Sequence, residues 1–446
     1  NGWSQTGAEA AAGVLGQIPG LFKAASASSS AQQTIATLIE QIRSQVGAAI
    51  PRLHELFDAL SAFLSEQVGS ARNTQDAYDQ KISLTPALRA QPGWTQVEIA
   101  WENLSVPTQQ VLRDLQRLYK ATEGLVSDDT MERNELLQEL KATLQRGTEL
   151  FAGLQKILIE PEPQGIYWIG VTHYGDEITL NSAPLHVGPL LKERLFDDKA
   201  CVILTSATLT TANSFRYIEE RLGLEDPDEL ILGSPFNYQS AVLLYVPKDM
   251  PEPNQPSYQQ YVERALLELF RASKGRGMAL FTSYNQLRVT ARNVAPQLLR
   301  DGIVVYEQAD GTSRRIMLEQ FKAAERGVLF GTRSFWEGVD VQGEKLSALA
   351  ICKLPFDVPT DPIFSARSET YEDPFNEYSV PETVLRFRQG FGRLIRSKTD
   401  RGVIVVLDRR LISKNYGASF INALPSPTIR RGPLTGLSRS VTEWLK

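Results

Sequence analysis

Residues 381–407 read PETVLRFRQGFGRLIRSKTDRGVIVVL, and this stretch joins an amphipathic pattern to a short, wholly apolar run. The first part predicts a helix over 381–396, because its apolar side chains recur at helical spacing. The second part, 403–407, contains only Val, Ile and Leu, which favours a strand buried on both faces. A helix followed by such a strand is the repeating unit of parallel α/β sheets.

The same alternation of helix and apolar strand extends outward from this stretch through the second half of the chain. Helices are predicted over 187–196, 258–272 and 313–324. The predicted strands are 200–204, 278–281, 303–306, 328–330 and 346–351. We therefore expect an α/β fold with a parallel sheet covered by helices on both faces, in which chemistry gathers at the carboxyl ends of the strands.

The first part of the chain has a different pattern. Residues 1 to about 30 are rich in Ala, Gly and Ser and predict a loose lead-in. Apolar residues then recur at helical spacing to about residue 160, which predicts a helical bundle or long antiparallel hairpins. Two short β-like runs follow at 165–171 and 177–180.

Composition describes an ordinary globular protein. The 446 residues are 42% hydrophobic and 22% charged, with a net charge of -5. Cys201 and Cys352 lie in apolar runs predicted to be buried strands, and the three histidines are scattered, so we expect neither a disulfide framework nor a metal site. No apolar run approaches the roughly 20 residues that span a bilayer, and no secretory signal opens the chain, so we expect a cytoplasmic protein with no membrane partner.

The opening stretch also concentrates positive charge. Between residues 386 and 410 there are eight basic side chains and two acidic ones. On a helix, Gln389, Arg393 and Arg396 would share one face, because they stand at i, i+4 and i+7. Gly390 and Gly392 would let another surface approach closely. Guanidinium groups suit phosphate oxygens and act as arginine fingers in phosphoryl transfer, whereas the plainer alternative is a solvated basic face.

Three other polar clusters directly follow predicted strands. The clusters at 205–209 and 282–285 carry small hydroxyls that bind a phosphate or cap the next helix. The third, at 331–343, is a polar loop with several glycines, and it contains Phe335 and Trp336 together with the carboxylates of Glu337 and Asp340. Bulky aromatic residues in such a loop favour function over packing.

Five motifs occur in a fixed order along the chain. They are Ser-Ala-Thr-Leu at 206–209, Phe-Thr-Ser-Tyr at 281–284, Phe-Trp-Glu-Gly-Val-Asp-Val-Gln-Gly at 335–343, Lys-Leu-Pro-Phe at 353–356 and Gln-Gly-Phe-Gly-Arg-Leu-Ile-Arg-Ser at 389–397. This ordered set resembles motifs III, IV, V and VI of the DinG branch of the XPD-like superfamily 2 helicases. The resemblance covers residues 166–446.

The resemblance implies an architecture and an activity. It divides the chain into an all-helical arch-like domain at 1–164, a remnant of the first RecA-like motor domain at 165–222 and the second RecA-like motor domain at 223–446. The implied activity is ATP-driven unwinding of DNA, with movement from 5′ to 3′ along a single strand. ATP and Mg²⁺ are the implied cofactors, and single-stranded DNA is the implied partner.

By motif correspondence, the resemblance also implies roles for individual residues. Arg393 and Arg396 would reach the γ-phosphate of ATP, and Gln389 would help to position the nucleotide. Glu337, Gly338 and Asp340 would line the nucleotide side of the cleft. Ser206 and Thr208 would couple hydrolysis to movement. The residues implied to contact a single strand are Ser283, Tyr284, Thr332, Ser334 and Trp336.

Several family features do not occur in the sequence. It has no Gly-x-x-x-x-Gly-Lys-Ser/Thr phosphate loop, no Asp-Glu-x-His box and none of the four cysteines that hold an iron–sulfur cluster in many relatives. Because the chain also begins with Asn1 rather than Met, we expect the carboxyl-terminal part of a larger helicase, which lacks its N-terminal motor half and hydrolyses ATP negligibly alone. The alternatives are a non-catalytic single-strand-binding module with a degenerate RecA-like fold, or a scaffold that binds no nucleic acid.

Overall fold

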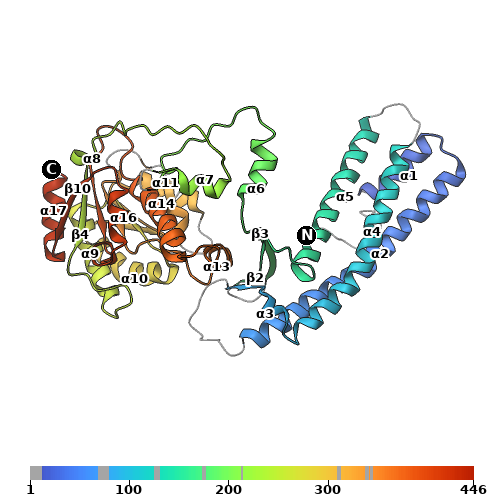
Figure 1. The fold of residues 1–446 in the computed structure, drawn as a ribbon, viewed down its shortest axis with the longest axis horizontal. Coiled ribbons are helices and arrows are strands. Elements are labelled where there is room, and N and C mark those ends of the chain that lie inside the picture. Colours follow the sequence, from blue (N-terminus) through green and yellow to red (C-terminus); the bar gives the residue numbers. More distant parts are fainter. Residues whose placement is uncertain are drawn as a thin grey trace. The chain divides into compact units, whose positions relative to one another are not determined.

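A computed structural model of the chain describes residues 13–68, 80–124, 131–172, 177–211, 214–308, 313–336, 341 and 345–446. The chain forms two compact units, Asn1–Leu185 and His186–Lys446, and each is described separately below (Figure 1). The boundary at 185/186 differs from the predicted boundaries at 164/165 and 222/223. The predicted division into a helical domain and parts of two motor domains stays a prediction.

Helices, most of them long, build the first unit, as the sequence predicts. They are α1 Val14–Ala24, α2 Ser29–Val68, α3 Pro86–Arg89, α4 Trp94–Glu123 and α5 Met131–Leu158. Helix α4 packs against both α2 and α5. The predicted loose lead-in is wrong for α1, because Ile18 and Phe22 lie one turn apart and bury themselves against apolar residues of the longer helices.

A small antiparallel sheet completes the first unit, with strands β1 Gln80–Ser83, β2 Gly165–Val171 and β3 Ile178–Pro184 in spatial order. Strands β2 and β3 confirm the two predicted β-like runs. Tyr167 and Ile169 of β2 share one hydrophobic core with Trp94 and Leu158 of the helices. This shared core places the strand pair with the helical region.

A seven-stranded sheet forms the centre of the second unit, and every pair of neighbouring strands in it is parallel. Its spatial order is β10-β4-β9-β8-β5-β7-β6. The strands are β4 Val242–Pro247, β5 Gly277–Leu280, β6 Val304–Glu307, β7 Gly327–Gly331, β8 Ala348–Ile351, β9 Gly402–Val406 and β10 Thr428–Gly432. The predicted parallel α/β architecture is confirmed, with β4 and β10 added to the strands that the sequence predicted.

Helices cover both faces of this sheet (Figure 1). One face packs against α11 Arg314–Ala323, α14 Val380–Phe391 and α16 Gly417–Asn422, and the other packs against α9 Tyr258–Ala272, α10 Tyr284–Arg300 and α17 Leu437–Trp444. Successive residues of β4 alternate between the two cores, because side chains of a strand point to opposite faces. The shorter helical elements are α6 Gly188–Leu191, η1 Lys192–Phe196, α7 Arg216–Leu222, α8 Tyr238–Ala241, α12 Arg333–Trp336, α13 Pro362–Ser368, η3 Pro374–Ser379, α15 Arg410–Ser413 and η4 Leu434–Gly436.

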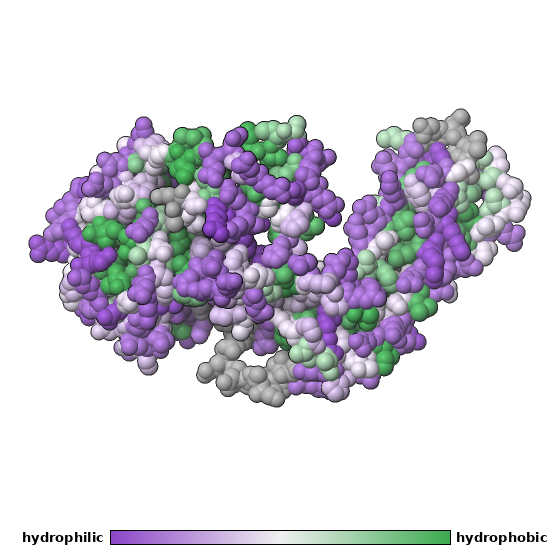
Figure 2. All heavy atoms as spheres, viewed as in Figure 1, coloured by the Kyte–Doolittle hydropathy of each residue, from purple (hydrophilic) through white to green (hydrophobic). Residues whose placement is uncertain are grey.

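The predicted strand at 200–204 is wrong. The segment pairs with no strand among the described residues, and Cys201 and Ile203 are exposed, the latter by 84%. An apolar run becomes a strand only beside neighbours that satisfy its backbone N–H and C=O groups. Leu230, Ile231 and Leu232 are also exposed. Figure 2 shows hydrophobic side chains at the surface in the upper part of the view, where Figure 1 draws the chain between α6 and α8.

Candidate functional site

Because all seven strands are parallel, the segments that follow them meet at one edge of the sheet. We call this the carboxyl edge. It is formed by the residues directly after β6, β7, β5, β8 and β9, which are neighbours in that spatial order. The predicted clusters at 282–285 and 331–343 and the Lys-Leu-Pro-Phe turn at 353–356 all belong to these segments.

Gln308, which directly follows β6, gathers three of the predicted side chains. Its Nε2 donates to the hydroxyl of Tyr284 at 2.5 Å and to Oγ of Ser334 at 3.1 Å. Its Oε1 accepts from Oγ1 and from the backbone N–H of Thr332, at 2.8 and 3.0 Å. We call these four residues the Gln308 network. One amide thus joins the ends of three strands and fixes the orientation of each hydroxyl.

Exposure differs among the members of the Gln308 network. Ser334 is exposed, Tyr284 is half-buried and Thr332 is buried. Thr332 is therefore an internal support, whereas Ser334 and Tyr284 can meet a ligand. Ser283 is the N-cap of α10, where its side chain accepts a hydrogen bond from the backbone N–H of Gln286. The capping role that the sequence left open for this cluster is confirmed.

Trp336 is largely buried at the carboxyl edge. Its side chain is only 4% exposed, and its ring Nε1–H donates to the carbonyl oxygen of Phe281 at 3.4 Å. Phe335 beside it is fully buried. The short helix α12 turns both rings into the core beneath the sheet edge, and Trp336 also lines a small cavity there, so its predicted contact with a single strand stays a prediction.

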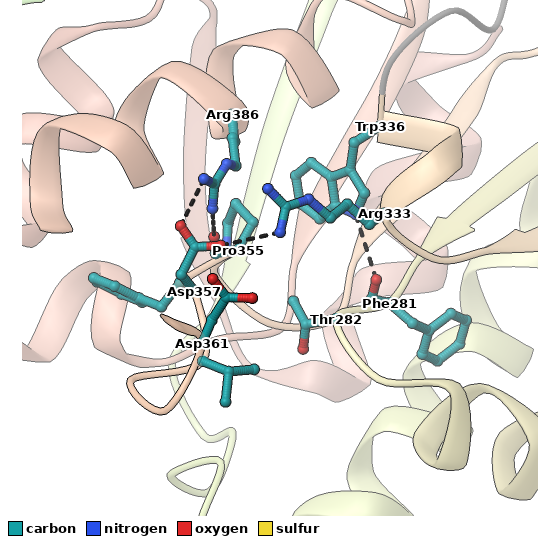
Figure 3. A pocket seen from close by; sticks show the side chains of 10 residues that line it. Phe281, Thr282, Arg333, Trp336, Pro355, Asp357, Asp361 and Arg386 are labelled. Atoms are coloured by element: carbon teal, nitrogen blue, oxygen red, sulfur yellow. Dashed lines mark hydrogen bonds and ion pairs between the residues drawn. The ribbon is translucent and has the colours of Figure 1, made fainter. Parts of the chain in front are cut away.

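A small cavity opens at the carboxyl edge, with a volume of about 110 Å³. Thr282 and Arg333 line one part of it, and the turn that carries Phe356 and Asp357 lines another. Figure 3 shows the guanidinium groups of Arg333 and Arg386 directed at Asp357, with separations of 3.1 and 2.6 Å. Asp361 also lines the cavity, so its two arginines face two aspartates and the lining charges balance.

Arg386 is the better-fixed of these two cations. It projects from α14 and also lies 3.5 Å from Glu382. Burial alone would lower the pKa of Arg386, but the hydrogen bond and charge of Asp357 outweigh burial and raise that pKa. Arg386 is therefore held as a permanent cation, whereas Arg333 keeps most of its side chain in solvent.

The predicted helix over 381–396 is wrong at its carboxyl end. Helix α14 ends at Phe391 with Gly392 as its C-cap, and Arg393 and Arg396 lie in the turns that follow. Two glycines lower the helical preference here by about 1 kcal/mol each. In addition, the Asp400 carboxylate accepts from the backbone N–H groups of Arg396 and Ser397, at 2.7 and 2.8 Å, and stabilises the turn. One helical face therefore does not hold both guanidiniums.

The two arginines also differ in their surroundings. Arg393 is half-buried and donates from Nε to the carbonyl oxygen of Trp336 at 2.9 Å, whereas Arg396 is exposed. The Oε1 atom of Gln389 is buried and has no hydrogen-bond partner among the residues that the structure describes. Glu337, Gly338 and Asp340 lie outside the described residues.

Ser206 and Thr208 lie in a turn held by α14. Their hydroxyls are 3.1 Å apart, and the guanidinium of Arg388 donates to the carbonyl oxygens of Thr210 and Ala207, the latter at 2.9 Å. Burial lowers the pKa of Arg388. The structure therefore brings the 206–210 turn to the helix of the arginine motif but not into the Gln308 network.

Sequence reasoning missed Gln308, Asp357, Arg386 and Arg388 as site residues. The signal that could have found Gln308 is its place directly after a predicted strand, the same rule that found the other edge clusters. In the described ranges, no group of three or more His, Cys, Asp or Glu side chains could hold a metal ion. Nor does that part of the chain contain a helix that is long and apolar enough to span a bilayer.

Comparison with known proteins places the carboxyl edge in a family context. The helicase C-terminal domain family matches residues 266–427. ATP-dependent DNA helicase YoaA of Haemophilus influenzae is 40% identical over 261 residues, which cover 58% of this chain and 40% of that protein. ATP-dependent DNA helicase YoaA of Escherichia coli is 36% identical over 316 residues, or 68% of this chain and 48% of that protein.

A third relative matches a larger share of the chain. The protein named 3'-5' exonuclease DinG of Bacillus subtilis is 32% identical over 335 residues, which cover 72% of this chain and 36% of that protein. The chain thus spans less than half the length of each of these three relatives.

Proposed function

Since residues 266–427 of this chain are a helicase C-terminal domain, homologous to the matching part of the DinG and YoaA helicases, we propose that the chain is the second motor half of an ATP-dependent DNA helicase that moves 5′ to 3′ on a single strand. Its carboxyl edge contacts the strand. Its arginine segment serves a nucleotide that a preceding motor half binds. Both activities belong to the whole protein.

The observation that carries this proposal is the Gln308 network. It fixes Tyr284 and Ser334 beside the N-terminus of α10, and Thr282 is exposed next to them. Hydroxyl groups and helix N-termini are groups that proteins use to bind phosphates of a nucleic-acid backbone without reading its sequence. A motor that moves along any sequence needs contacts of this kind.

The residues present fit one end of a bound ATP molecule. The buried, unpartnered oxygen of Gln389 can accept a hydrogen bond from a nucleoside amino or hydroxyl group, and Arg393 and Arg396 supply guanidinium groups for phosphate oxygens. ATP bound between two motor halves would supply the phosphoryl group whose transfer drives movement. In this arrangement Gln389 would position the nucleotide, and the two arginines would neutralise the negative charge of its phosphate oxygens.

An equilibrium titration tests the strand-binding part. The full chain is titrated against a fluorescently labelled single-stranded oligothymidine, and anisotropy is followed at low salt, because phosphate contacts weaken as salt rises. The Gln308→Ala variant should bind about tenfold more weakly, which corresponds to the loss of one or two hydrogen bonds. Gln297→Ala is the matched control, since Gln297 lies near the far end of α10 and donates only to the backbone oxygen of Asn293.

Three outcomes would count against the proposal. If the unmodified chain does not bind the oligonucleotide, the strand-binding role fails. If both glutamine variants bind equally well, the Gln308 network is not the contact. For the motor part, we expect the chain alone to hydrolyse ATP negligibly, and robust DNA-stimulated hydrolysis by this chain would contradict the proposed need for a preceding half.

A further inference from the structure

The carboxyl edge continues beyond the cavity into a cluster of aromatic rings after β8 and β9. Phe356 lies in the turn after β8, Tyr416 follows α15, the short helix that comes after β9, and Phe375 lies on η3. We call these three residues the aromatic platform. The rings of Phe356 and Phe375 are stacked, with centroids 5.8 Å apart and planes at 15°. Tyr416 meets both rings edge-on, at 5.7 and 5.2 Å.

The aromatic platform is ordered but not closed. Phe356 and Tyr416 are half-buried, and their rings rest near the fully buried Phe420. Phe375, in contrast, is 43% exposed. A ring that served packing alone would gain most from full burial. An exposed ring stacked on a fixed neighbour presents an aromatic surface to a planar ligand without having to order itself first.

One arginine contacts the aromatic platform, and exposed acidic residues, Glu372, Asp373 and Glu377, flank Phe375 in sequence. The guanidinium of Arg410 lies over the ring of Phe356, 5.3 Å from its centroid, and is held by the fully buried carboxylate of Asp408 at 2.6 Å. Asp408 also accepts from the backbone N–H of Leu354, so it fixes both Arg410 and the turn that carries Phe356. Two further basic residues nearby in sequence, Arg409 and Lys414, are exposed.

The aromatic platform is continuous with the proposed strand-binding edge. Phe356 lines the cavity together with Thr282 and Arg333, which neighbour the Gln308 network in sequence. From β6, which precedes Gln308, to β9 the edge crosses four strand spacings, or about 19 Å at roughly 4.8 Å each. Hydroxyl groups thus occupy one end of this edge, and aromatic rings with Arg410 occupy the other.

We infer that Phe356, Phe375 and Tyr416 form a stacking site for an unpaired nucleobase of the strand whose backbone the Gln308 network contacts. This inference rests on the proposed function, because it concerns the same single strand. Stacking on aromatic rings holds bases of any sequence, since every base has a π face, and the Arg410 guanidinium over Phe356 adds a cation beside the rings. Contacts of this kind therefore suit a protein that must not select sequence.

The decisive experiment compares strands with and without bases. The full chain is titrated with labelled oligothymidine and with an abasic oligomer of the same length and charge. Phe375→Ala should weaken oligothymidine binding by about 5- to 150-fold, the range for loss of one base–aromatic stack, and should leave binding of the abasic oligomer unchanged. Phe375→Trp should restore binding to within about twofold, because it restores an aromatic surface of similar kind.

Matched variants separate this inference from the proposed function. Leu299→Ala removes another exposed apolar side chain, at the far end of α10, and should change neither titration. Gln308→Ala should weaken binding of both oligomers, since it acts on backbone contacts. If the unmodified chain binds neither oligomer, the proposed function fails. If Gln308→Ala weakens binding but Phe375→Ala does not, or if Phe375→Ala weakens both oligomers equally, the stacking site is wrong while the proposed function stands.

Discussion

At Gly390 the absence of a side chain decides how closely α14 approaches the loop after β7. A Cβ atom there would lie 2.8 Å from two ring carbons of Trp336, a distance that real Cβ atoms do not show. The sequence pattern predicted close approach at both Gly390 and Gly392. Only Gly390 meets another element, because the nearest atoms to a Cβ at Gly392 are backbone oxygens of α14 itself.

The Gly390→Ala substitution should destabilise the second unit by about 1–3 kcal/mol, the usual cost of overpacking a filled core. Urea unfolding followed by circular dichroism measures this loss. Gly392→Ala is the control, because its Cβ would be 3.4 Å from the nearest atom and its backbone is already helical. Equal stability of the two variants would contradict the proposed steric role of Gly390.

The residues predicted to contact a single strand show how much of a site can be predicted from residue type and position in the sequence. Tyr284, Thr332 and Ser334 were placed at the carboxyl edge because each follows a strand, and the structure brings them together through Gln308. The same rule placed Trp336 at the edge but did not reveal which way its ring turns. That direction depends on the space left by Gly390, some 50 residues later in the chain, which no local pattern encodes.

Helix α14 joins two parts of the site through residues two positions apart. Arg386 reaches Asp357 at the cavity, whereas Arg388 reaches the carbonyl oxygens of Ala207 and Thr210. Residues at i and i+2 of a helix point to different sides, so these two contacts leave the helix in different directions. A shift of α14 would therefore move the 206–210 turn and the cavity wall together.

Arg388→Met should release the 206–210 turn while the sheet stays folded. Because a hydrogen bond that involves a charged group contributes about 1.5–3 kcal/mol, backbone amides of the turn should exchange hydrogen about 10- to 150-fold faster. Hydrogen-exchange mass spectrometry measures this change. Arg216→Met, which removes an exposed i,i+4 ion pair on α7, should leave exchange in the turn unaltered. Unchanged exchange in both variants would mean that Arg388 does not hold the turn.

Secondary structure was predictable where the sequence pattern of an element is strong and its neighbouring strands and helices are present. Helix α9 agrees with its predicted range at both ends, and strands β5 to β9 agree within two residues. Strand β10 was missed because it lies at the edge of the sheet and carries two exposed arginines, Arg430 and Arg431, so that it shows no alternation. The apolar run at 200–204 was overpredicted because hydrophobicity alone does not supply a partner strand.

The second unit and the first have separate hydrophobic cores. The first unit buries Leu60, Trp94 and Trp101 among its helices, whereas the second buries its seven strands between two layers of helices. A chain with separate cores unfolds as separate cooperative units unless a large interface couples them. The change of sequence pattern near residue 160 predicted separate parts, but the position of the division depends on which strands share a core.

We therefore expect two unfolding transitions. Leu60→Ala, in the first core, should lower the stability of that unit by about 2–5 kcal/mol and leave the second transition in place. Hydrogen exchange at increasing urea concentration follows peptides of α2 and of β9 in the same sample. Val405→Ala in the second core should have the converse effect. A simultaneous shift of both transitions in either variant would show that the units unfold together.

The position of β4 inside the sheet has a consequence for how the chain reaches its native state. Strand β4 begins at residue 242, yet its neighbours β9 and β10 begin at residues 402 and 428. During synthesis, about 160 residues must emerge from the ribosome before this hydrophobic strand finds its first partner, and such non-local pairings close slowly. A nascent chain paused before residue 402 would hold an unpaired apolar strand in water, so chaperones would be most needed while the middle of the second unit is being translated.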